Sequence, residues 1–298
     1  METPPVCSYE GSDYQTSFWD EGNRAYEDAC EEIALRRLLP ASGQQLLELG
    51  AGAGRNTPRY HGYRNIVLLD YSFTQLQQAR QRLGDSERYR FVAADIYRLP
   101  FVDGLFDGAT MIRTLHHMAD APLALAQVRR VLQPGALFIL EFANKRNLKS
   151  ILRYLFRRQN WNPFSQEPVE FAALNFDFHP RAIKRWLSGC GFKIERLLTV
   201  SHFRAGFFKR YVPARLLARL DALLQWSGWL VQFSPSAFVR SRVEGSAPET
   251  PPEDFFACPA CQAPLPDTPP ELTCPRCGRL FPVREGIYDL RLNPPREE

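Results

Sequence analysis

Three acidic side chains each follow a short apolar stretch of the sequence. Glu48 lies at the end of the first stretch, Asp70 closes the second at 65–70, and Asp95 comes just after the third at 89–93. The carboxyl ends of parallel strands meet at one edge of a sheet, so the three carboxylates are expected around one pocket. Asp70 would accept ribose hydroxyls there and Asp95 the exocyclic amine of an adenine. Glu48 would orient the loop that follows it or bind an ammonium group.

Glycine occupies every second position directly after the first acid, at Gly50, Gly52 and Gly54. Glycine takes positive φ without strain and lets a ligand approach the main chain closely. A helix beginning after such a loop would present free N–H groups to the ligand. The spacing Gly-x-Gly-x-Gly departs from the Gly-x-Gly-x-x-Gly that places a pyrophosphate under a helix. It favours an adenosine ligand with an amino-acid tail over a dinucleotide, with a plain turn as the alternative.

A second cluster of chemically active residues lies near the C-terminus. Cys258 and Cys261 form one Cys-x2-Cys pair, and Cys274 and Cys277 form a second. Twelve residues lie between the two pairs. Four thiolates at this spacing suit tetrahedral zinc, and a set without histidine or an open position predicts a structural metal. The segment is too short for a self-sufficient core, so the metal is expected to hold it folded.

The remaining cysteines, Cys7, Cys30 and Cys190, are scattered along the chain. They form no disulfide framework, and no stretch is typical of a signal peptide or a membrane-spanning helix. These observations predict a cytoplasmic protein. The 298 residues are 45% hydrophobic, which allows one large domain and a small one.

Charge is distributed unevenly. Residues 141–245 carry 18 Lys and Arg against 7 Asp and Glu, a net charge of +11, whereas 1–140 carry −3 and 246–298 carry −4. The basic block has three interpretations: it grips the phosphates of RNA, it lies on an anionic membrane and admits a lipid-like substrate, or it is a solvated face. The second interpretation predicts peripheral association with a membrane.

Strands and helices are expected to alternate, which predicts a Rossmann-like, doubly wound, mostly parallel α/β sheet. The expected strands are 45–49, 65–70, 89–93, 105–112, 136–142 and 192–200, and the expected helices are 23–39, 73–83, 121–132, 180–187 and 213–225.

The predicted domains follow from composition. Residues 1–244 form the large domain, and about 143–178 form a basic insertion or lid over the mouth of its sheet. Residues 245–255, which include three prolines, are the linker, and 256–298 form the zinc ribbon.

The ordered motifs of 45–142 resemble the class I S-adenosylmethionine-dependent methyltransferases, in particular the branch acting on small molecules and quinones. The matching segments are 48–54, 69–72, 94–101, 106–107 and 132–136. The resemblance implies a seven-stranded sheet whose last hairpin is antiparallel. It also implies a set of cofactor-binding residues. They are Glu48, Gly50, Ala51, Gly52, Gly54, Asp70, Tyr71, Asp95, Ile96 and Arg113.

Methyl transfer from a sulfonium needs a base only if the acceptor must lose a proton. His116 and His117 lie where the family's substrate loop begins, so one of them is a candidate base. The alternative is that one satisfies a backbone carbonyl and the other packs. No Asn/Asp-Pro-Pro-Tyr follows the fourth strand, which disfavours methylation of an exocyclic base nitrogen or a glutamine amide.

The segment 278–287 resembles the zinc ribbons related to the activator subunit of tRNA and release-factor methyltransferases. Three roles are open for the linked ribbon: docking in cis, stabilising the catalytic domain, or recognising the substrate. Its net charge of −4 against the +11 block favours docking on electrostatic grounds. The first interpretation is a methyltransferase acting on a small, hydrophobic or lipid-like acceptor. The alternatives are a methyltransferase of tRNA, rRNA or a translation protein, and a non-catalytic cofactor-binding scaffold.

Overall fold

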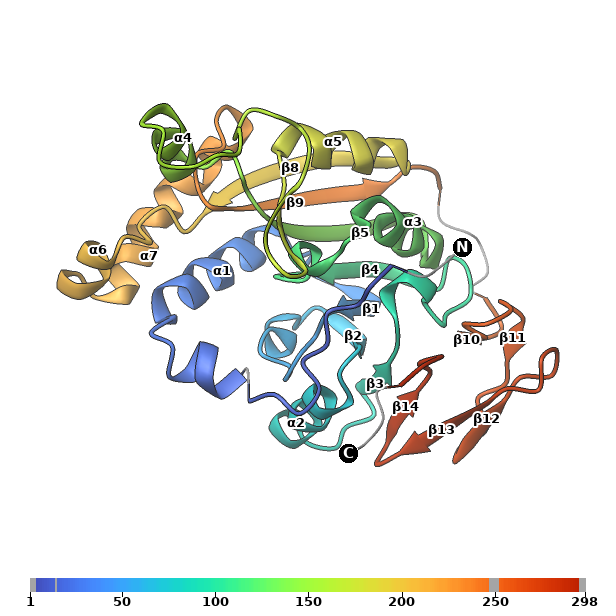
Figure 1. The fold of residues 1–298 in the computed structure, drawn as a ribbon. Coiled ribbons are helices and arrows are strands. Elements are labelled where there is room, and N and C mark those ends of the chain that lie inside the picture. The colour runs from blue at the N-terminus through green and yellow to red at the C-terminus, as the bar shows by residue number, and fades with distance from the viewer. Residues whose placement is uncertain (1–3, 14, 247–251, 295–298) are drawn as a thin grey trace.

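The computed structural model describes residues 4–13, 15–246 and 252–294. A ten-stranded sheet runs through it, with the strand order β12-β13-β14-β3-β2-β1-β4-β5-β9-β8 (Figure 1). The strands of its large domain are β1 Gly43–Leu49, β2 Tyr63–Asp70, β3 Tyr89–Ala93, β4 Phe106–Met111, β5 Leu132–Ala143, β8 Phe192–Val200 and β9 Ser236–Val243.

These seven strands form the predicted mostly parallel sheet. β1 pairs in parallel with β2 on one side and β4 on the other, and β9 runs antiparallel between β5 and β8. The strand order therefore reverses between β1 and β4. Ligands of open α/β sheets bind outside the carboxyl ends of the strands at such a reversal.

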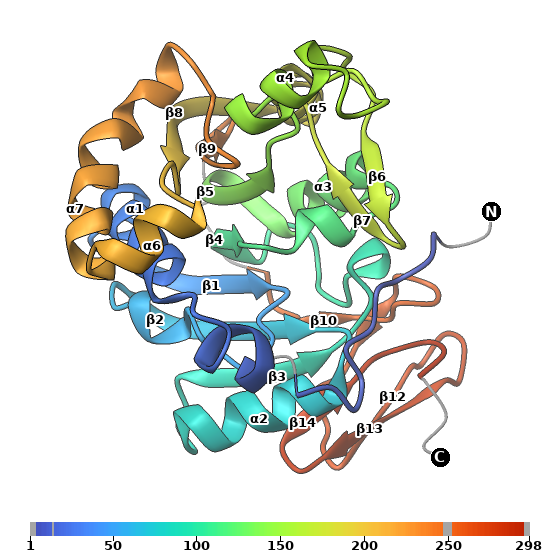
Figure 2. The ribbon, with the colours of Figure 1, turned by 60° about the vertical axis from the view of Figure 1, so that its left-hand side comes forward.

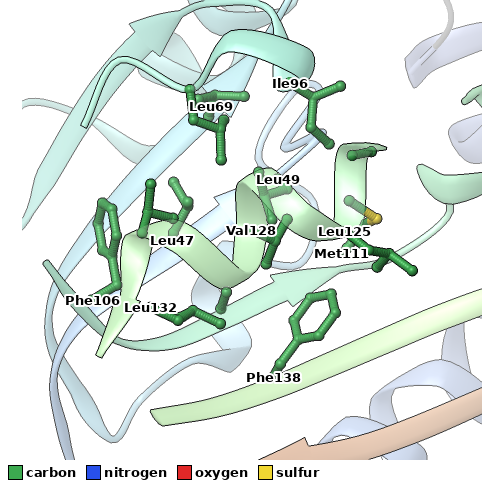
Figure 3. Packing of buried hydrophobic residues seen from close by; sticks show 14 of the residues in the cluster. Leu47, Leu49, Leu69, Ile96, Phe106, Met111, Leu125, Val128, Leu132 and Phe138 are labelled. Carbon is green, nitrogen blue, oxygen red and sulfur yellow. The ribbon is translucent and has the colours of Figure 1, made fainter. Parts of the chain in front are cut away.

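Helices cover both faces of the sheet. One face is covered by α1 (Ala25–Leu38), α2 (Phe73–Leu83) and α7 (Ala214–Leu224), and the other by α3 (Ala121–Val131) and α5 (Pro180–Gly189). Figure 3 shows how Leu125 and Val128 of α3 pack with Leu47 and Leu49 of β1. This core fixes the strand ends from which the functional loops project.

The basic segment expected to form a lid contains one helix and one hairpin. α4 spans Leu148–Leu155, and β6 (Val169–Ala172) pairs with β7 (Asn175–Asp177). Asn144 forms a bridge with Phe178, which holds the base of this segment at the end of β5. Two further elements follow β8. They are α6 (Gly206–Tyr211) and the 3-10 helix η5 (Gln225–Trp229).

The C-terminal ribbon extends the same sheet. It contains β10 (Phe256–Ala257), β11 (Pro264–Leu265), β12 (Glu271–Thr273), β13 (Leu280–Arg284) and β14 (Ile287–Asp289). β14 pairs in parallel with β3, so three ribbon strands continue the large domain's sheet at its β3 edge (Figures 1 and 2). The described part of the linker is 245–246 and 252–255.

The ribbon docks in cis, but the electrostatic reason given for docking was wrong. Backbone bonds and aromatic packing hold it, because the Ala257 N–H donates to the Pro100 carbonyl at 3.0 Å and the Phe101 and Phe256 rings stack at 6.0 Å. The Leu290 N–H also donates to the Ala93 carbonyl at 2.8 Å. These partners belong to β3 and the loop after it, outside the basic block.

Candidate active site

The glycine loop has the backbone geometry that its sequence predicts. Gly50, Gly52 and Gly54 have φ of 65°, 52° and 71°. A Cβ on Gly50 would lie 2.1 Å from Oγ1 of Thr114, so only glycine fits there. At Gly52 the nearest atom to an added Cβ would be 3.8 Å away, which leaves open space in front of the loop where a ligand can approach its main chain.

Asp70 ties the loop to the end of β2. Its Oδ2 accepts the Gly52 N–H at 2.8 Å and its Oδ1 accepts the Ser72 N–H at 2.9 Å. Burial raises the pKa of Asp70, while the backbone donors counteract the rise by favouring the carboxylate. The side chain lines the pocket next to Tyr71, where its remaining lone pairs can accept from a ligand.

Eight of the ten predicted cofactor residues line this pocket, namely Glu48, Gly50, Ala51, Gly52, Asp70, Tyr71, Ile96 and Arg113. Gly54 instead faces α2, where an added Cβ would lie 3.1 Å from Leu83 and 3.3 Å from Ala79. Asp95 caps the short helix after β3 by accepting the Tyr97 N–H at 2.9 Å, while its neighbours line the pocket.

Glu48 is a buried carboxylate at the back of the pocket. It is 4% exposed, and its Oε2 accepts the Thr57 hydroxyl at 2.6 Å. Burial raises its pKa to about 7. A positive group placed beside it would favour the ionised form, as an amino-acid ammonium would.

A network of ionic groups that the sequence did not reveal holds the far side of the pocket. The fully buried carboxylate of Glu31 accepts Arg113 Nε at 2.5 Å and Arg55 Nη2 at 2.7 Å. Its pKa is about 2, because the two guanidinium groups outweigh the desolvation that burial imposes. The partners are 24 and 82 residues away in sequence, so no local pattern predicts the network.

The N-terminal segment closes one side of the pocket, and no motif in its sequence predicts this position. Val6 forms a bridge with Met118, and Cys7, Tyr9, Gln15 and Trp19 line the pocket. The segment has no apolar periodicity that would place it. Its aromatic residues were the only signal available.

A larger cavity of about 1240 Å³ adjoins the pocket. The two share Tyr9, Arg113 and His117 in their walls. α4, the β6–β7 hairpin and the ends of β5 and β8 surround the cavity, and its apolar lining includes Leu152 and Phe171. The segment that was predicted to form a lid therefore lines one side of this cavity.

The two histidines differ in what surrounds them. His117 Nδ1 lies 3.1 Å from the Leu174 carbonyl and Nε2 lies 3.1 Å from the Tyr9 hydroxyl, so both ring nitrogens have partners. Because a carbonyl can only accept, Nδ1 carries the proton. The His116 ring lies against that of His117, with the centroids 4.0 Å apart and the planes tilted by 46°, and it faces the cavity. Burial lowers the pKa of both rings, that of His116 to well below its ordinary range.

The four cysteines of the ribbon converge. Their Sγ atoms all lie within 4.8 Å of one another, at 3.7 Å for Cys258–Cys277 and 3.5 Å for Cys261–Cys274. Tetrahedral zinc with Zn–S bonds of about 2.3 Å places thiolates roughly 3.8 Å apart, so the set fits this metal. Each pair is followed by the same turn, in which Gln262 and Gly278 take positive φ.

Two family models match the chain. Residues 47–140 match a model described as a methyltransferase domain, and residues 254–286 match one described as a Trm112p-like protein. The first segment contains the glycine loop and the second contains the four cysteines.

The chain carries a methyltransferase domain followed by a Trm112p-like domain. The resemblance drawn from the motifs is therefore confirmed for both parts.

Curated relatives match the methyltransferase domain. An O-methyltransferase of Penicillium expansum is 31% identical over 142 residues, which are 44% of this chain and 51% of that protein. A demethylmenaquinone methyltransferase of Clavibacter sepedonicus is 34% identical over 141 residues, covering 43% of this chain and 58% of that protein. The chain thus spans about half the length of these relatives.

Solved structures share the fold. A chain from the complex of the Haloferax volcanii Trm112 methyltransferase activator with a methyltransferase has a TM-score of 0.56 at 16% identity, covering 78% of this chain and 96% of that one. An S-adenosylmethionine-dependent methyltransferase structure from Listeria monocytogenes has a TM-score of 0.55 at 16% identity, covering 74% and 99%. The Rossmann-like fold inferred for the methyltransferase domain is confirmed.

Proposed function

We propose that the protein is an S-adenosylmethionine-dependent methyltransferase that acts on a small hydrophobic or lipid-like acceptor, with structural zinc in its Trm112p-like domain. One observation carries the proposal. The glycine-loop pocket at the switch point opens past Arg113 and His117 into a separate cavity large enough for a second ligand. A scaffold that only held the cofactor would need no such cavity.

The residues in the pocket fit the cofactor. Asp70 would accept the ribose hydroxyls, the main chain at Gly50 and Gly52 would lie along the amino-acid tail, and Glu48 would face its ammonium group. When bound, the cofactor supplies a methyl group on a sulfonium, which is already activated for transfer. The protein's contribution is then mainly to hold the acceptor in line and to exclude water.

Two groups in the cavity can take a proton from the acceptor. His116 is neutral, and among the described residues no protein group hydrogen-bonds its ring. Asp177 is the second group, and burial raises its pKa to about 6. We assign the base role to His116 and a positioning role to His117, whose two ring nitrogens are already engaged.

Exposed apolar side chains lie on segments beside the cavity, and Leu148, Leu152, Phe156 and Phe233 also line it. We define the amphipathic face as the exposed apolar residues of 148–156 and 207–233. They are Leu148, Leu152, Leu155, Phe156, Phe207, Phe208, Tyr211, Leu216, Leu220, Leu223, Leu224, Trp226, Trp229, Leu230, Val231 and Phe233. Figure 1 shows α4, α6 and α7 on the side of the molecule away from the ribbon, and Figure 2 shows α4 separated from the neighbouring pair α6 and α7.

We propose that this face rests on an anionic membrane. Leu223 and Leu230 are 76% and 83% exposed, and Lys149, Arg153 and Arg219 lie on the same helices. Exposed leucines beside cations suit the boundary of acidic headgroups and acyl chains. Within the described residues, every helix is too short or too polar to span a bilayer.

Flotation with vesicles tests the membrane proposal. Wild-type protein should float with vesicles containing phosphatidylserine and not with pure phosphatidylcholine. The double variant Leu223→Glu/Leu230→Glu should lose most of this binding, whereas Leu280→Glu, on the exposed ribbon surface, should retain it. Equal flotation of the double variant and the wild type would overturn the membrane proposal. Salt-sensitive binding of RNA by a wild-type protein that does not float would overturn it as well.

Transfer of a labelled methyl group into fractionated cell extract tests the activity. Wild-type protein should label the lipid or small-molecule fraction, and Asp70→Ala should label nothing because its cofactor pocket is disrupted. Label in RNA or protein would instead identify one of those acceptors. Cofactor binding without any transfer would identify a non-catalytic protein.

A further inference from the structure

The larger cavity contains a cation with two donors that find no hydrogen-bond partner within the described part of the chain. Arg204 lines the cavity, and its Nε and Nη2 atoms are buried without a hydrogen-bond partner among the described residues. A buried guanidinium with unused donors is costly, because it has lost water and gained nothing in exchange. Native proteins rarely keep such a group unless a ligand pairs with it.

Four carboxylates act electrostatically on Arg204. Asp177 lines the same cavity, whereas Glu141, Glu31 and Glu27 are engaged by other donors. Glu141 accepts the Arg113 N–H at 3.0 Å and the Ser236 hydroxyl at 2.5 Å. Glu31 is held by Arg55 and Arg113, and Glu27 accepts Lys209 at 3.1 Å. These three glutamates lower the cost of placing a charge here, but their oxygens are already used by other donors.

The donors of Arg204 are therefore left for a molecule in the cavity. They are two N–H groups on one side of a planar guanidinium, which suits an oxyanion better than a neutral carbonyl. The nearby carboxylates offset part of the charge, but among the described residues none accepts a hydrogen bond from these two N–H groups. Leu152, Phe156, Phe171 and Phe233 supply apolar lining for the rest of such a molecule.

We propose that Arg204 binds an oxyanion of the methyl acceptor, a carboxylate or an ionised phenol or enol, whose apolar body lies along these residues. This inference rests on the proposed function and specifies the acceptor class. An apolar acceptor with an acidic oxygen would enter with its tail toward the amphipathic face. Arg204 would hold the oxyanion at the buried end of the cavity, near His116.

Binding of two matched probes to the zinc-loaded full-length protein tests the inference without any turnover. The probes are 4-octylbenzoate and its neutral analogue 4-octylbenzamide, titrated by calorimetry below their micelle concentrations. Wild-type protein should bind the benzoate at least tenfold more tightly. Equal affinity for the two probes would overturn the inference, and this comparison requires no variant.

Variants locate the effect. Arg204→Gln should weaken the benzoate at least tenfold and leave the benzamide unchanged, while Arg204→Lys should retain part of the preference. Arg210→Gln, on an exposed position of α6, is the matched control and should bind as wild type. Equal losses of both probes in Arg204→Gln would indicate a packing role and contradict the assignment.

A separate titration with S-adenosylmethionine distinguishes the two proposals. If Arg204 only contacts the acceptor, the Arg204→Gln variant should bind the cofactor as tightly as wild type does. Failure of wild-type protein to bind the cofactor would overturn the proposed function. The benzoate preference would still be decided by the probe pair alone.

Discussion

Two buried glutamates at the cofactor pocket have opposite electrostatic surroundings. Glu31 is paired with two guanidinium groups and its pKa is about 2, whereas Glu48 is hydrogen-bonded to the hydroxyls of Thr57 and Tyr60 and its pKa is about 7. Both are buried to a similar degree, so partners rather than burial set the difference. Their roles follow: Glu31 is structural, and Glu48 is suited to a cation that arrives with the ligand.

The first prediction concerns stability in acid. The pKa of Glu31 is lower in the folded protein than its ordinary 4.5, so it stabilises the fold fully above that value and less as pH falls toward 2. The contribution is at most on the order of 3 kcal/mol. Urea unfolding from pH 6 to pH 3 should therefore show a shallower loss for Glu31→Gln than for wild type. Glu32→Gln, at an exposed position, should follow wild type; identical slopes for all three would contradict the assignment.

The second prediction concerns cofactor affinity. The carboxylate of Glu48 forms as pH rises through about 7, so affinity for S-adenosylmethionine should increase several-fold from pH 6 to pH 8. In Glu48→Gln the affinity should be lower and should vary much less with pH. Calorimetry at three pH values measures this, and an equally steep dependence in the variant would exclude Glu48 as the titrating group.

Among the elements, β14 has a position that links the ribbon to the cofactor pocket. Arg291, just after β14, is 6% exposed and donates from Nη1 to the Tyr71 carbonyl at 3.1 Å and to Glu10 at 3.0 Å. Glu10 in turn accepts the N–H groups of Phe73 and Thr74 at the start of α2. The turn after Asp70 is thus held by the ribbon and by the N-terminal segment together.

We therefore expect Arg291→Ala to weaken cofactor binding about tenfold, because the turn that positions Asp70 and Tyr71 loses its anchor and Asp289 loses its buried partner. Arg279→Ala, on the exposed part of the ribbon, is the control. Calorimetry measures the affinity, and circular dichroism checks that both variants are folded. Wild-type affinity in Arg291→Ala would show that the ribbon does not influence the pocket.

The elements that could be predicted from the sequence are those with local signals. Apolar runs predicted β1 to β5, glycine and the acids predicted the pocket, and cysteine spacing predicted the ribbon. No apolar run predicted β9, because its residues 236–243 mix apolar and polar side chains. The strand is buried because it pairs with β5 on one side and β8 on the other. The Glu31 network and the β3–β14 pairing depend on partners far away in sequence, and no local pattern encodes them.

At the scale of the whole molecule, the two domains share one sheet and one core. Phe101 and Phe106 of the methyltransferase domain belong to the same buried cluster as Phe256 and Leu265 of the Trm112p-like domain. β14 also covers the edge of β3, whose backbone groups would otherwise be open to pairing with other chains. The ribbon thus stabilises the methyltransferase domain as part of its sheet.

Loss of the metal should consequently affect the entire chain. Chelation of zinc, or Cys274→Ser, is expected to lower the melting temperature of the methyltransferase domain by about 5 °C or more and to promote aggregation through β3. Calorimetric melting with and without chelator measures this. Cys190→Ser, outside the ribbon, should melt as wild type, and an unchanged methyltransferase transition after metal loss would refute the coupling.

We propose above all that the glycine-loop pocket binds S-adenosylmethionine through Asp70. Titration calorimetry of the cofactor into wild type, Asp70→Ala and the exposed-site control Asp85→Ala tests it directly. We predict one site per chain in wild type and in Asp85→Ala, with affinity reduced at least a hundredfold in a folded Asp70→Ala. No binding to wild type, or unchanged affinity in Asp70→Ala, would contradict the claim.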